Sequence, residues 1–209
     1  LAEILRLKSS ITIAGSHGKT TTTSIVSCIL EGANFDPTVI NGGIINNYNT
    51  NAKLGKGQWI IAEADESDGS FTYLPSTICL INNIDPEHLD FYGTFEKLKK
   101  AFLEYANNVP FYGFISICSD HRNLKFLIKK LTNKKVVTFG LGKGSAVSAK
   151  NIKIIEKNEI FYTQFDLVIN IRKSEEVNKL MIPILGNHNL RNTLEIKKDH
   201  LKTPVEKKH

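Results

Sequence analysis

The segment AGSHGKTTTT, residues 14–23, constrains the fold of this chain more than any other part of its sequence. Residues 11–14 are mostly apolar, as in a buried strand, and residues 18–31 carry apolar side chains at helical spacing. Gly32 stands where the C-terminal cap of that helix is expected. A Gly-Lys-Thr triplet alone is common in turns, so the strand before it and the helix after it are what favour a phosphate-binding loop.

The glycines of this segment predict a shortened form of that loop. The common pattern has Gly, four residues of any type and then Gly-Lys-Ser/Thr, but Ile13 stands where the first Gly should be. Gly15 and Gly18 remain, and two glycines let successive backbone N–H groups point at an anion at the positive end of the helix. Lys19 would then neutralise phosphate oxygens, and the hydroxyl of Thr20 would bind Mg²⁺.

Apolar stretches of strand length alternate with amphipathic stretches of helix length up to residue 140. This alternation is typical of an α/β fold with a mainly parallel, doubly wound sheet, here built around the phosphate-binding loop (a P-loop sheet). Further strands are expected at residues 59–62, 78–81, 113–119 and 134–140. Helices are expected at residues 94–107, with Thr94 as N-cap, and at residues 121–131.

The alternation then gives way to three strand-like stretches with no helix between them. They predict a small antiparallel β-sheet at residues 145–185, appended to the main sheet. We expect residues 1–10 to form a linker or the tail of a helix, and residues 11–194 to form one domain that includes the small sheet. Residues 195–209 are basic, and a poorly ordered tail is expected there.

The composition is that of an ordinary soluble globular protein, with 41% hydrophobic and 23% charged residues. No apolar run is long enough to span a membrane and no secretory signal opens the chain, so we expect a cytoplasmic protein with no membrane partner. The net charge of +6 comes from scattered lysines without interleaved aromatic residues, and we expect no nucleic-acid partner. Cys28, Cys79 and Cys118 lie among apolar residues and are expected to be buried, reduced thiols. Because the only methionine is Met181 and residue 1 is Leu, we expect a piece of a longer protein.

Acidic side chains follow the expected strand at residues 59–62, at the kind of strand end where open α/β sheets bind their ligands. Glu63 is placed to act as the second half of a metal site, because Mg²⁺ prefers oxygen ligands. A lone glutamate at a strand end can equally be a solvated turn carboxylate. However, Asp65, Glu66 and Asp68 follow closely, and like charges at this density repel one another unless a cation or a basic substrate lies among them.

The strand at residues 78–81 leads into a second polar segment, NNIDPEHLDFYG. Within it Pro86 could open a helical turn that Asp85 caps, with His88 in that turn. A lone histidine there is more often a surface residue than a ligand. If this strand and the one before it are neighbours of the first strand, all three motifs converge on one edge of the sheet. That convergence makes His88 a candidate site residue.

The segment GNHNLRN is typical of a loop that enters a helix, and it carries His188, Asn189 and Asn192. A flat ring and two amides suit stacking on a purine and hydrogen bonding to it. Helix capping by asparagine explains the same residues equally well when they are taken alone.

Five segments, taken together and in this order, resemble the central ATPase domain of the Mur ligases. They are GSHGKTTTT, EADESDGSF, NNIDPEHLDFYG, VPFYG and GNHNLRN. The resemblance covers about residues 1–194. His17 stands before Gly-Lys-Thr, where other Mur ligases commonly carry Asn, and together with DESDGSF it favours the members that add L-alanine. Muropeptide-recycling ligases and folylpolyglutamate synthetases are more distant relatives.

The resemblance implies a cytoplasmic, ATP-dependent ligase of peptidoglycan biosynthesis, with ATP and Mg²⁺ as cofactors. ATP would phosphorylate the lactyl carboxylate of UDP-N-acetylmuramate to an acyl phosphate. The amine of L-alanine would attack it, and a tetrahedral intermediate would collapse to amide and phosphate. A carboxylate is a poor electrophile until its oxygen becomes a good leaving group, so this chemistry agrees with a phosphate cradle and its cations.

The resemblance also implies roles for single residues, with Lys19, Glu63 and His88 as the catalytic set. Thr20 and Glu63 would bind one Mg²⁺ ion, and His88 would bind a second near the acyl phosphate. The phosphate cradle would consist of Gly15, Ser16, His17, Gly18, Lys19, Thr20 and Thr21. The adenine would be contacted by His188, Asn189 and Asn192. The substrate side would be shaped by Asp65, Glu66 and Ser67.

The chain departs from the family pattern in two ways. The family's N-terminal domain, which binds the UDP group, and its C-terminal domain, which closes over ATP and the amino acid, match no part of this sequence. We expect those missing domains to be its partners, and the fragment alone not to be fully active. After Asn192 the family usually continues along an Ala-rich helix, whereas TLEIKKDHLKTPVEKKH follows here. The alternatives are a truncated, non-catalytic nucleotide-binding module, or another ligase of the superfamily such as the muropeptide-recycling enzyme.

Overall fold

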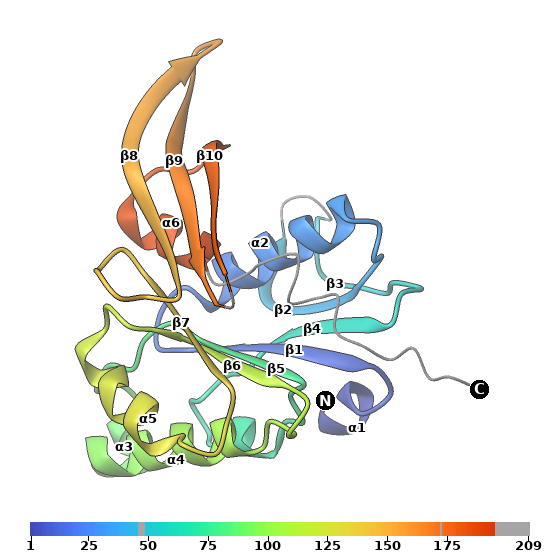
Figure 1. Cartoon of the computed structure of the whole chain (residues 1–209). Helices are drawn as coiled ribbons and strands as arrows, with labels where there is room; N and C mark the ends of the chain where they lie inside the picture. The colour runs from blue at the N-terminus through green and yellow to red at the C-terminus, as the bar shows by residue number, and fades with distance from the viewer. Residues whose placement is uncertain (46–48, 172, 195–209) are drawn as a thin grey trace.

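The computed structural model describes residues 1–45, 49–171 and 173–194. These residues form one sheet with the strand order β10-β9-β8-β7-β6-β5-β1-β4-β2-β3 and with helices on both faces (Figure 1). All the strands expected up to residue 140 are present. They are β1 (Ser9–Ala14), β4 (Trp59–Glu63), β5 (Ile78–Ile81), β6 (Phe114–Cys118) and β7 (Val136–Gly140). The tail expected at residues 195–209 lies outside the described residues.

The central strands run parallel, which confirms the doubly wound sheet predicted from the sequence. β1 pairs with β4 on one side and with β5 on the other, and β6 and β7 continue the sheet beyond β5. β1 is almost wholly buried, as expected for a strand whose two faces are both covered. Ile13 lies opposite Glu63, and Ala14 lies opposite Ile81. The loops that follow β1, β4 and β5 therefore start at the same edge of the sheet.

Two strands that the sequence did not predict extend the sheet beyond β4. β2 (Thr38–Ile45) pairs in parallel with β4, and β3 (Thr50–Lys53) pairs antiparallel with β2. β2 contains Asn41 and Gly42, residue types that are depleted in strands, so its sequence favours a loop until the neighbouring strand is considered. This pairing brings the backbone N–H of Gly42 into hydrogen-bonding contact with Glu63.

Helices cover the two faces of the sheet (Figure 1). α2 (Lys19–Gly32) contacts β1, β2 and β4, and α6 (Asn187–Leu194) packs beside α2. The opposite face carries α3 (Leu89–Tyr92), α4 (Phe95–Asn107) and α5 (Lys125–Lys130). The remaining short helices are α1 (Ala2–Leu5), η1 (Ser70–Tyr73), which contacts α4, and η2 (Arg122–Leu124).

Helix boundaries follow the sequence where a local cap defines them. α4 begins where predicted, and the hydroxyl of Thr94 accepts a hydrogen bond of 3.3 Å from the backbone N–H of Lys97. α2 includes Gly32 and is capped by Ala33, so Gly32 is not the cap that the sequence predicted. The single helix expected at residues 121–131 is instead η2 followed by the short α5.

The antiparallel strands expected at residues 145–185 are present as β8 (Val147–Lys157), β9 (Ile160–Asn170) and β10 (Ser174–Ile182). They form consecutive antiparallel pairs and rise away from the helical layers (Figure 1). They are not a separate sheet, because β8 continues the main one through a short parallel pairing with β7. α6 follows β10 and returns the chain to the edge of the sheet that carries the glycine-rich loop.

The cysteine prediction is correct at two of three positions. Cys79 and Cys118 are buried, but Cys28 is exposed on α2. The buried stripe of α2 includes Val26 and Leu30, and Cys28 falls outside this stripe. Its apolar neighbours in sequence therefore point elsewhere.

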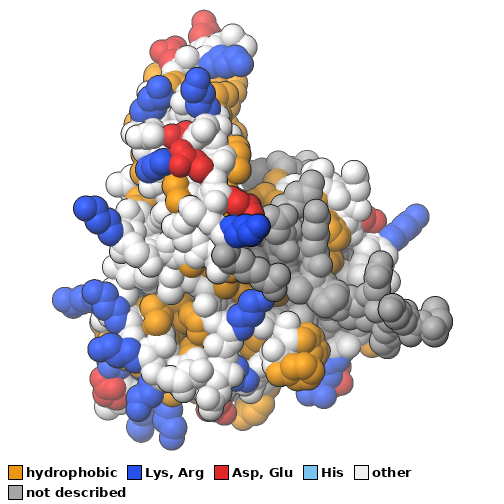
Figure 2. Space-filling view, viewed as in Figure 1, with side chains coloured by type: hydrophobic (Ala, Val, Ile, Leu, Met, Phe, Trp, Pro, Cys, Tyr) orange, Lys and Arg blue, Asp and Glu red, His pale blue; other side chains and the backbone are white. Residues whose placement is uncertain are grey.

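The surface carries its positive charge in separate places. On the face shown in Figure 2, Lys and Arg side chains are scattered over the lower part of the molecule, where α3, α4 and α5 lie in Figure 1, and over the projecting strands. Within the described residues, no helix combines the length and apolar character needed to cross a membrane.

Candidate functional site

The glycine-rich loop lies between β1 and α2 and is confined by the loop after β5. Gly15 and Gly18 have φ angles of 142° and 82°, which L side chains rarely adopt. A Cβ atom on Gly15 would lie 3.1 Å from the carbonyl oxygen of Asn83, so the position has little room for a side chain. Asn83 also accepts a 2.8 Å hydrogen bond from His17 N and donates a 3.0 Å hydrogen bond to His17 O. These two hydrogen bonds hold the glycine-rich loop against the loop that follows β5.

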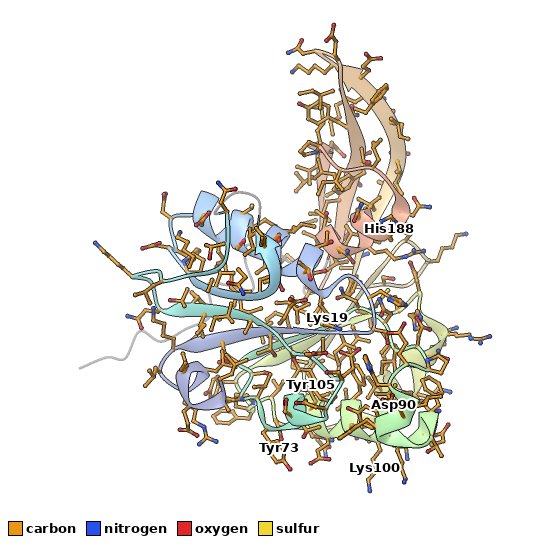
Figure 3. The ribbon with its side chains drawn as sticks, turned by 180° about the vertical axis from the view of Figure 1, so that it is seen from behind. Lys19, Tyr73, Asp90, Lys100, Tyr105 and His188 are labelled. Atoms are coloured by element: carbon orange, nitrogen blue, oxygen red, sulfur yellow. The ribbon has the colours of Figure 1, made fainter. Side chains whose placement is uncertain are left out.

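Lys19 begins α2, and its ammonium group turns back over the loop. Nζ donates to the carbonyl oxygen of Gly15 and to Oε2 of Glu66, each over 2.9 Å. The side chain of Lys19 is 16% exposed and that of Glu66 is 0% exposed, so the ion pair is largely shielded from water. In the view of Figure 3, Lys19 lies at the centre of the molecule, between His188 of α6 and Tyr105 of α4.

Thr20 and Glu63, the two residues that the sequence analysis assigned to one Mg²⁺ ion, are in contact with each other. Thr20 Oγ1 donates to Glu63 Oε1 over 2.9 Å, and the other carboxylate oxygen accepts from the N–H of Gly42. A pocket of about 390 Å³ opens here. Its lining consists of Leu1, Lys19, Thr20, Ile40, Asn41, Gly42, Glu63 and Asp65. Hydroxyl and carboxylate oxygens at the mouth of a pocket suit Mg²⁺.

His88 lies on the loop after β5, but the helical turn around it differs from the prediction. α3 begins at Leu89 with His88 as its N-cap in the left-handed conformation, φ 54°, so Pro86 does not open the helix and Asp85 does not cap it. Instead, the backbone N–H of Asp85 donates a 2.9 Å hydrogen bond to the hydroxyl oxygen of Ser16. This contact ties the segment that carries His88 to the glycine-rich loop.

A carboxylate pair accompanies His88. One ligand atom each from Glu66, Glu87 and His88 lie within 4.8 Å of one another, an arrangement that can hold a metal ion. The phenol of Tyr92 donates to the backbone oxygen of Glu66. Burial, followed by the negative charge of Glu66, raises the pKa of Tyr92 to about 12, so the phenol stays protonated and donating.

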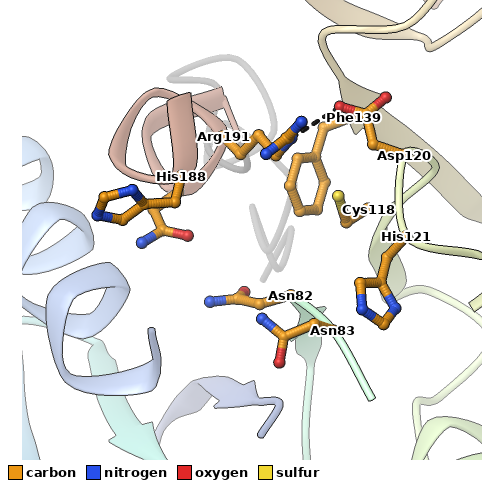
Figure 4. A pocket seen from close by; sticks show the side chains of 9 residues that line it. Asn82, Asn83, Cys118, Asp120, His121, Phe139, His188 and Arg191 are labelled. Carbon is orange, nitrogen blue, oxygen red and sulfur yellow. Dashed lines mark hydrogen bonds and ion pairs between the residues drawn. The ribbon is translucent and has the colours of Figure 1, made fainter. Parts of the chain in front are cut away.

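A second cavity, of about 210 Å³, lies between the loop after β5 and α6 (Figure 4). It is lined by Asn82, Asn83, Cys118, Asp120, His121, Phe139, His188, Arg191 and Asn192. The mixture of amides, rings and apolar carbon suits a planar heterocycle. Two of the three residues that the sequence assigned to adenine, His188 and Asn192, line this cavity. A Cβ atom on Gly18 would lie 3.1 Å from Nδ2 of Asn192, so the cavity adjoins the glycine-rich loop.

The third of these residues, Asn189, does not line the cavity. Its Nδ2 donates to the carbonyl oxygen of Leu185 over 2.8 Å, and its backbone oxygen accepts from Thr193. The assignment of Asn189 to adenine therefore has no support from the cavity lining, and its contact within the described residues is local to α6.

An ion pair closes one wall of the second cavity. Arg191 Nε donates to Asp120 Oδ2 over 2.8 Å, as the dashed line in Figure 4 marks. The same carboxylate accepts from the backbone N–H groups of Leu141 and Gly142, over 2.8 and 2.9 Å. Burial acts to raise the pKa of Asp120, but the hydrogen bonds from Arg191 and the two backbone groups outweigh it and lower the pKa.

Sequence reasoning missed several residues of these two sites. Three of them, Asn82, Asn83 and Glu87, lie in the segment NNIDPEHLDFYG, which the sequence analysis had already singled out. Their position after β5 could have indicated that they belong to the site. Arg191 also lies in such a segment, GNHNLRN, but nothing local pairs it with Asp120, because the two residues are separated by 71 positions and only the fold joins them.

Comparison with known proteins matches this architecture to one family. Residues 13–195 match the model of the Mur ligase middle domain. The UDP-N-acetylmuramate–L-alanine ligase of Rhodospirillum centenum is 47% identical over 194 residues, which cover 93% of this chain and 40% of that protein. The chain therefore spans well under half the length of the curated relatives that it matches.

Solved structures agree in fold. The UDP-N-acetylmuramate–alanine ligase from Thermotoga maritima has a TM-score of 0.75 at 24% identity, covering 92% of this chain and 41% of that chain. A MurF ligase from Thermotoga maritima in complex with ADP has a TM-score of 0.67 at 18% identity, covering 93% of this chain and 46% of that chain. The family match over most of the sequence, supported by this shared fold, shows that the chain belongs to the Mur ligases and represents their middle domain.

Proposed function

We propose that this chain is the ATP-binding middle domain of a ligase that joins L-alanine to UDP-N-acetylmuramate through an acyl phosphate. The observation that carries the proposal is the meeting of Lys19, Thr20 and Glu63 at one pocket, directly after a glycine-rich loop at a helix N-terminus. The identity of the substrates is inferred from the name of the relatives at 47% identity. The solved MurF ligase with ADP supports a nucleotide as ligand.

Lys19 would neutralise phosphate oxygens during transfer. An ammonium group carries three donors, and two of them are engaged by Gly15 and Glu66 within the described part of the chain. One N–H is therefore left for a phosphate oxygen. Because Glu66 already holds the charge of Lys19 in place, little reorganisation is needed when a phosphate arrives.

The donor set fits Mg²⁺, which when bound would offset the negative charge that accumulates between phosphate and carboxylate. Thr20 and Glu63 would hold one ion through a hydroxyl and a carboxylate oxygen. Gly42 orients the Glu63 carboxylate through its backbone N–H, and its lack of a side chain leaves room for that contact. His88, whose ligand atom lies within 4.8 Å of one from Glu66, would hold a second ion.

The cavity between the loop after β5 and α6 would bind the adenine. His188 offers a ring and Asn192 an amide, and the cavity adjoins the glycine-rich loop at Gly18. A nucleotide could then extend from this cavity to the loop, with its phosphates reaching Lys19. The acid and amine substrates would approach from the pocket beside Glu63 and Asp65.

Calorimetric titration with Mg·ATP tests the proposal. Wild-type protein should bind one ATP saturably, Lys19→Ala should weaken binding at least about tenfold, and the exposed Lys100→Ala on α4 should not. Supplying the N- and C-terminal domains should then produce phosphate release that requires both L-alanine and UDP-N-acetylmuramate. Folded wild-type protein that binds no ATP, or that binds it equally well with Ala at position 19, would contradict the proposal.

A further inference from the structure

Asn41 of β2 carries a buried amide without a hydrogen-bond partner. The residue is 4% exposed, and neither Oδ1 nor Nδ2 forms a hydrogen bond within the described part of the chain. Burying a polar group without a partner is unfavourable, and most buried polar atoms of side chains in folded proteins are hydrogen-bonded. An amide with both atoms unpartnered therefore indicates that a ligand or an ordered water completes it.

The position of Asn41 in β2 places this amide near the start of α2. Asn41 lines the pocket that also contains Thr20 and Glu63. Positions 41 and 43 share one face of the strand, because side chains alternate along it. A Cβ atom on Gly43 would lie 3.2 Å from Cγ2 of Thr20, so the Asn41 side chain lies on the face of β2 that meets the first turn of α2.

The chemistry of an amide limits what ligand can complete Asn41. Its side chain offers one acceptor oxygen and two N–H donors, so the ligand must supply both an acceptor and a donor. A phosphoryl group bound to Mg²⁺ supplies both, because its oxygens accept from Nδ2 and the water molecules that Mg²⁺ usually keeps can donate to Oδ1. A bare anion would leave Oδ1 without a donor.

The two cavities of the site indicate which phosphoryl group would reach Asn41. The proposed adenine cavity and the pocket of Asn41 have no described lining residue in common. The adenine cavity adjoins Gly18, whereas Lys19 and Thr20 line the pocket of Asn41. A nucleotide that extends from the adenine cavity across the glycine-rich loop therefore reaches Asn41 with its terminal phosphate.

We propose that the Asn41 side chain binds the terminal phosphoryl group of ATP, which is the group transferred in the reaction, and thereby distinguishes ATP from ADP. This inference rests on the proposed function and deepens it. It adds to the phosphate cradle a residue of β2, a strand that lies outside the glycine-rich loop.

A structural water is the competing explanation. Thr23 Oγ1, on α2, is also buried without a partner among the described residues. One water could join this hydroxyl to Asn41 and stabilise the contact between α2 and β2. In that case, removing the amide should lower the free energy of unfolding and leave the ratio of the ATP and ADP affinities unchanged.

Calorimetric titrations of Asn41→Leu with Mg·ATP and with Mg·ADP test the inference. Leucine is close to asparagine in size and forms no side-chain hydrogen bond, so the affinity for Mg·ATP should fall about tenfold and that for Mg·ADP by less than about twofold. Without nucleotide, the variant should unfold at the same or a higher urea concentration than the wild type, because an unpartnered buried amide is removed. The matched control is Asn51→Leu on the exposed strand β3, which should leave both affinities within about twofold.

The wild-type protein offers a second measurement that does not depend on the folding of a variant. The proton resonances of the Asn41 side-chain amide should shift when Mg·ATP binds and should shift far less when Mg·ADP binds. An unchanged ratio of the two affinities in folded Asn41→Leu, or amide resonances that respond equally to both nucleotides, would overturn the inference and leave the proposed function standing. Folded wild-type protein that binds neither nucleotide would overturn both.

Discussion

Arg191 of α6 and Asp120, which follows β6, are joined by a 2.8 Å hydrogen bond across one wall of the cavity that adjoins Gly18. The bond ties a helix near the end of the described chain to the middle of the sheet. His188 and Asn192 lie on the same helix as Arg191 and line the same cavity, so the ion pair tethers the helix that carries them.

Arg191→Ala should weaken ATP binding about tenfold while leaving the binding of inorganic triphosphate unchanged. The reason is that α6 loses its link to Asp120 and the proposed adenine cavity widens, whereas Lys19 and the glycine-rich loop keep their contacts. Calorimetric titrations with the two ligands measure the difference. Equal weakening for both ligands would show that Arg191 acts on the phosphates instead.

Asp120→Asn should change how stability depends on pH. The pKa of Asp120 is lowered in the folded state from the ordinary value of 3.8, so its charge stabilises the fold fully above that value. This contribution is lost as the pH falls below it and through the lowered folded-state pKa. Wild-type protein should therefore lose its advantage over the variant progressively as the pH falls below about 4, as measured by urea unfolding at a series of pH values. In an Arg191→Ala background the same substitution should alter the pH dependence less.

Local patterns in the sequence predicted most of the central fold. The apolar run before Gly15 predicted β1, and Thr94 predicted the start of α4 because its hydroxyl caps the helix through contacts only three residues away. β2 was missed because Asn41 and Gly42 disfavour a strand locally, and pairing with β4 overrides that preference.

Some residues of the candidate site could likewise be predicted from local sequence, and others could not. Lys19, Thr20 and Glu63 could be predicted because each directly follows a recognisable strand or loop. The partnership of Glu66 with Lys19 spans 47 positions, and that of Asp120 with Arg191 spans 71, so no local pattern carries either one. The cavity residues Asn82 and Asn83 have side chains whose roles depend on the loop that the sheet places opposite them.

Thr94→Ala should lower the free energy of unfolding by about 1 kcal/mol. The Thr94 hydroxyl accepts the hydrogen bond from Lys97 N, and alanine leaves that N–H at the start of α4 without a side-chain partner. Urea unfolding measures the change, and Thr94→Ser serves as the control because it keeps the hydroxyl. A loss of the same size in Thr94→Ser would mean that the methyl group, rather than the cap, carries the effect.

Gly42→Ala should separate folding from metal-nucleotide binding. A Cβ atom at Gly42 would lie 2.5 Å from Oε2 of Glu63, which is the far end of a flexible side chain, so the carboxylate can move aside and the fold should persist. When the Glu63 carboxylate moves, its oxygen no longer lies beside the Thr20 hydroxyl, and the two groups can no longer bind the same ion. The affinity for Mg·ATP should therefore fall at least about tenfold.

The matched variant is Gly32→Ala at the end of α2, where a Cβ atom meets nothing within 4 Å. There alanine favours the helix, and the free energy of unfolding should rise by about 0.5–1 kcal/mol with ATP binding unchanged. Calorimetry and thermal unfolding of both variants separate the two effects. If Gly42→Ala bound Mg·ATP as tightly as the wild type, the position of the Glu63 carboxylate would not matter for the ion, and the role proposed for the Thr20–Glu63 pair would be wrong.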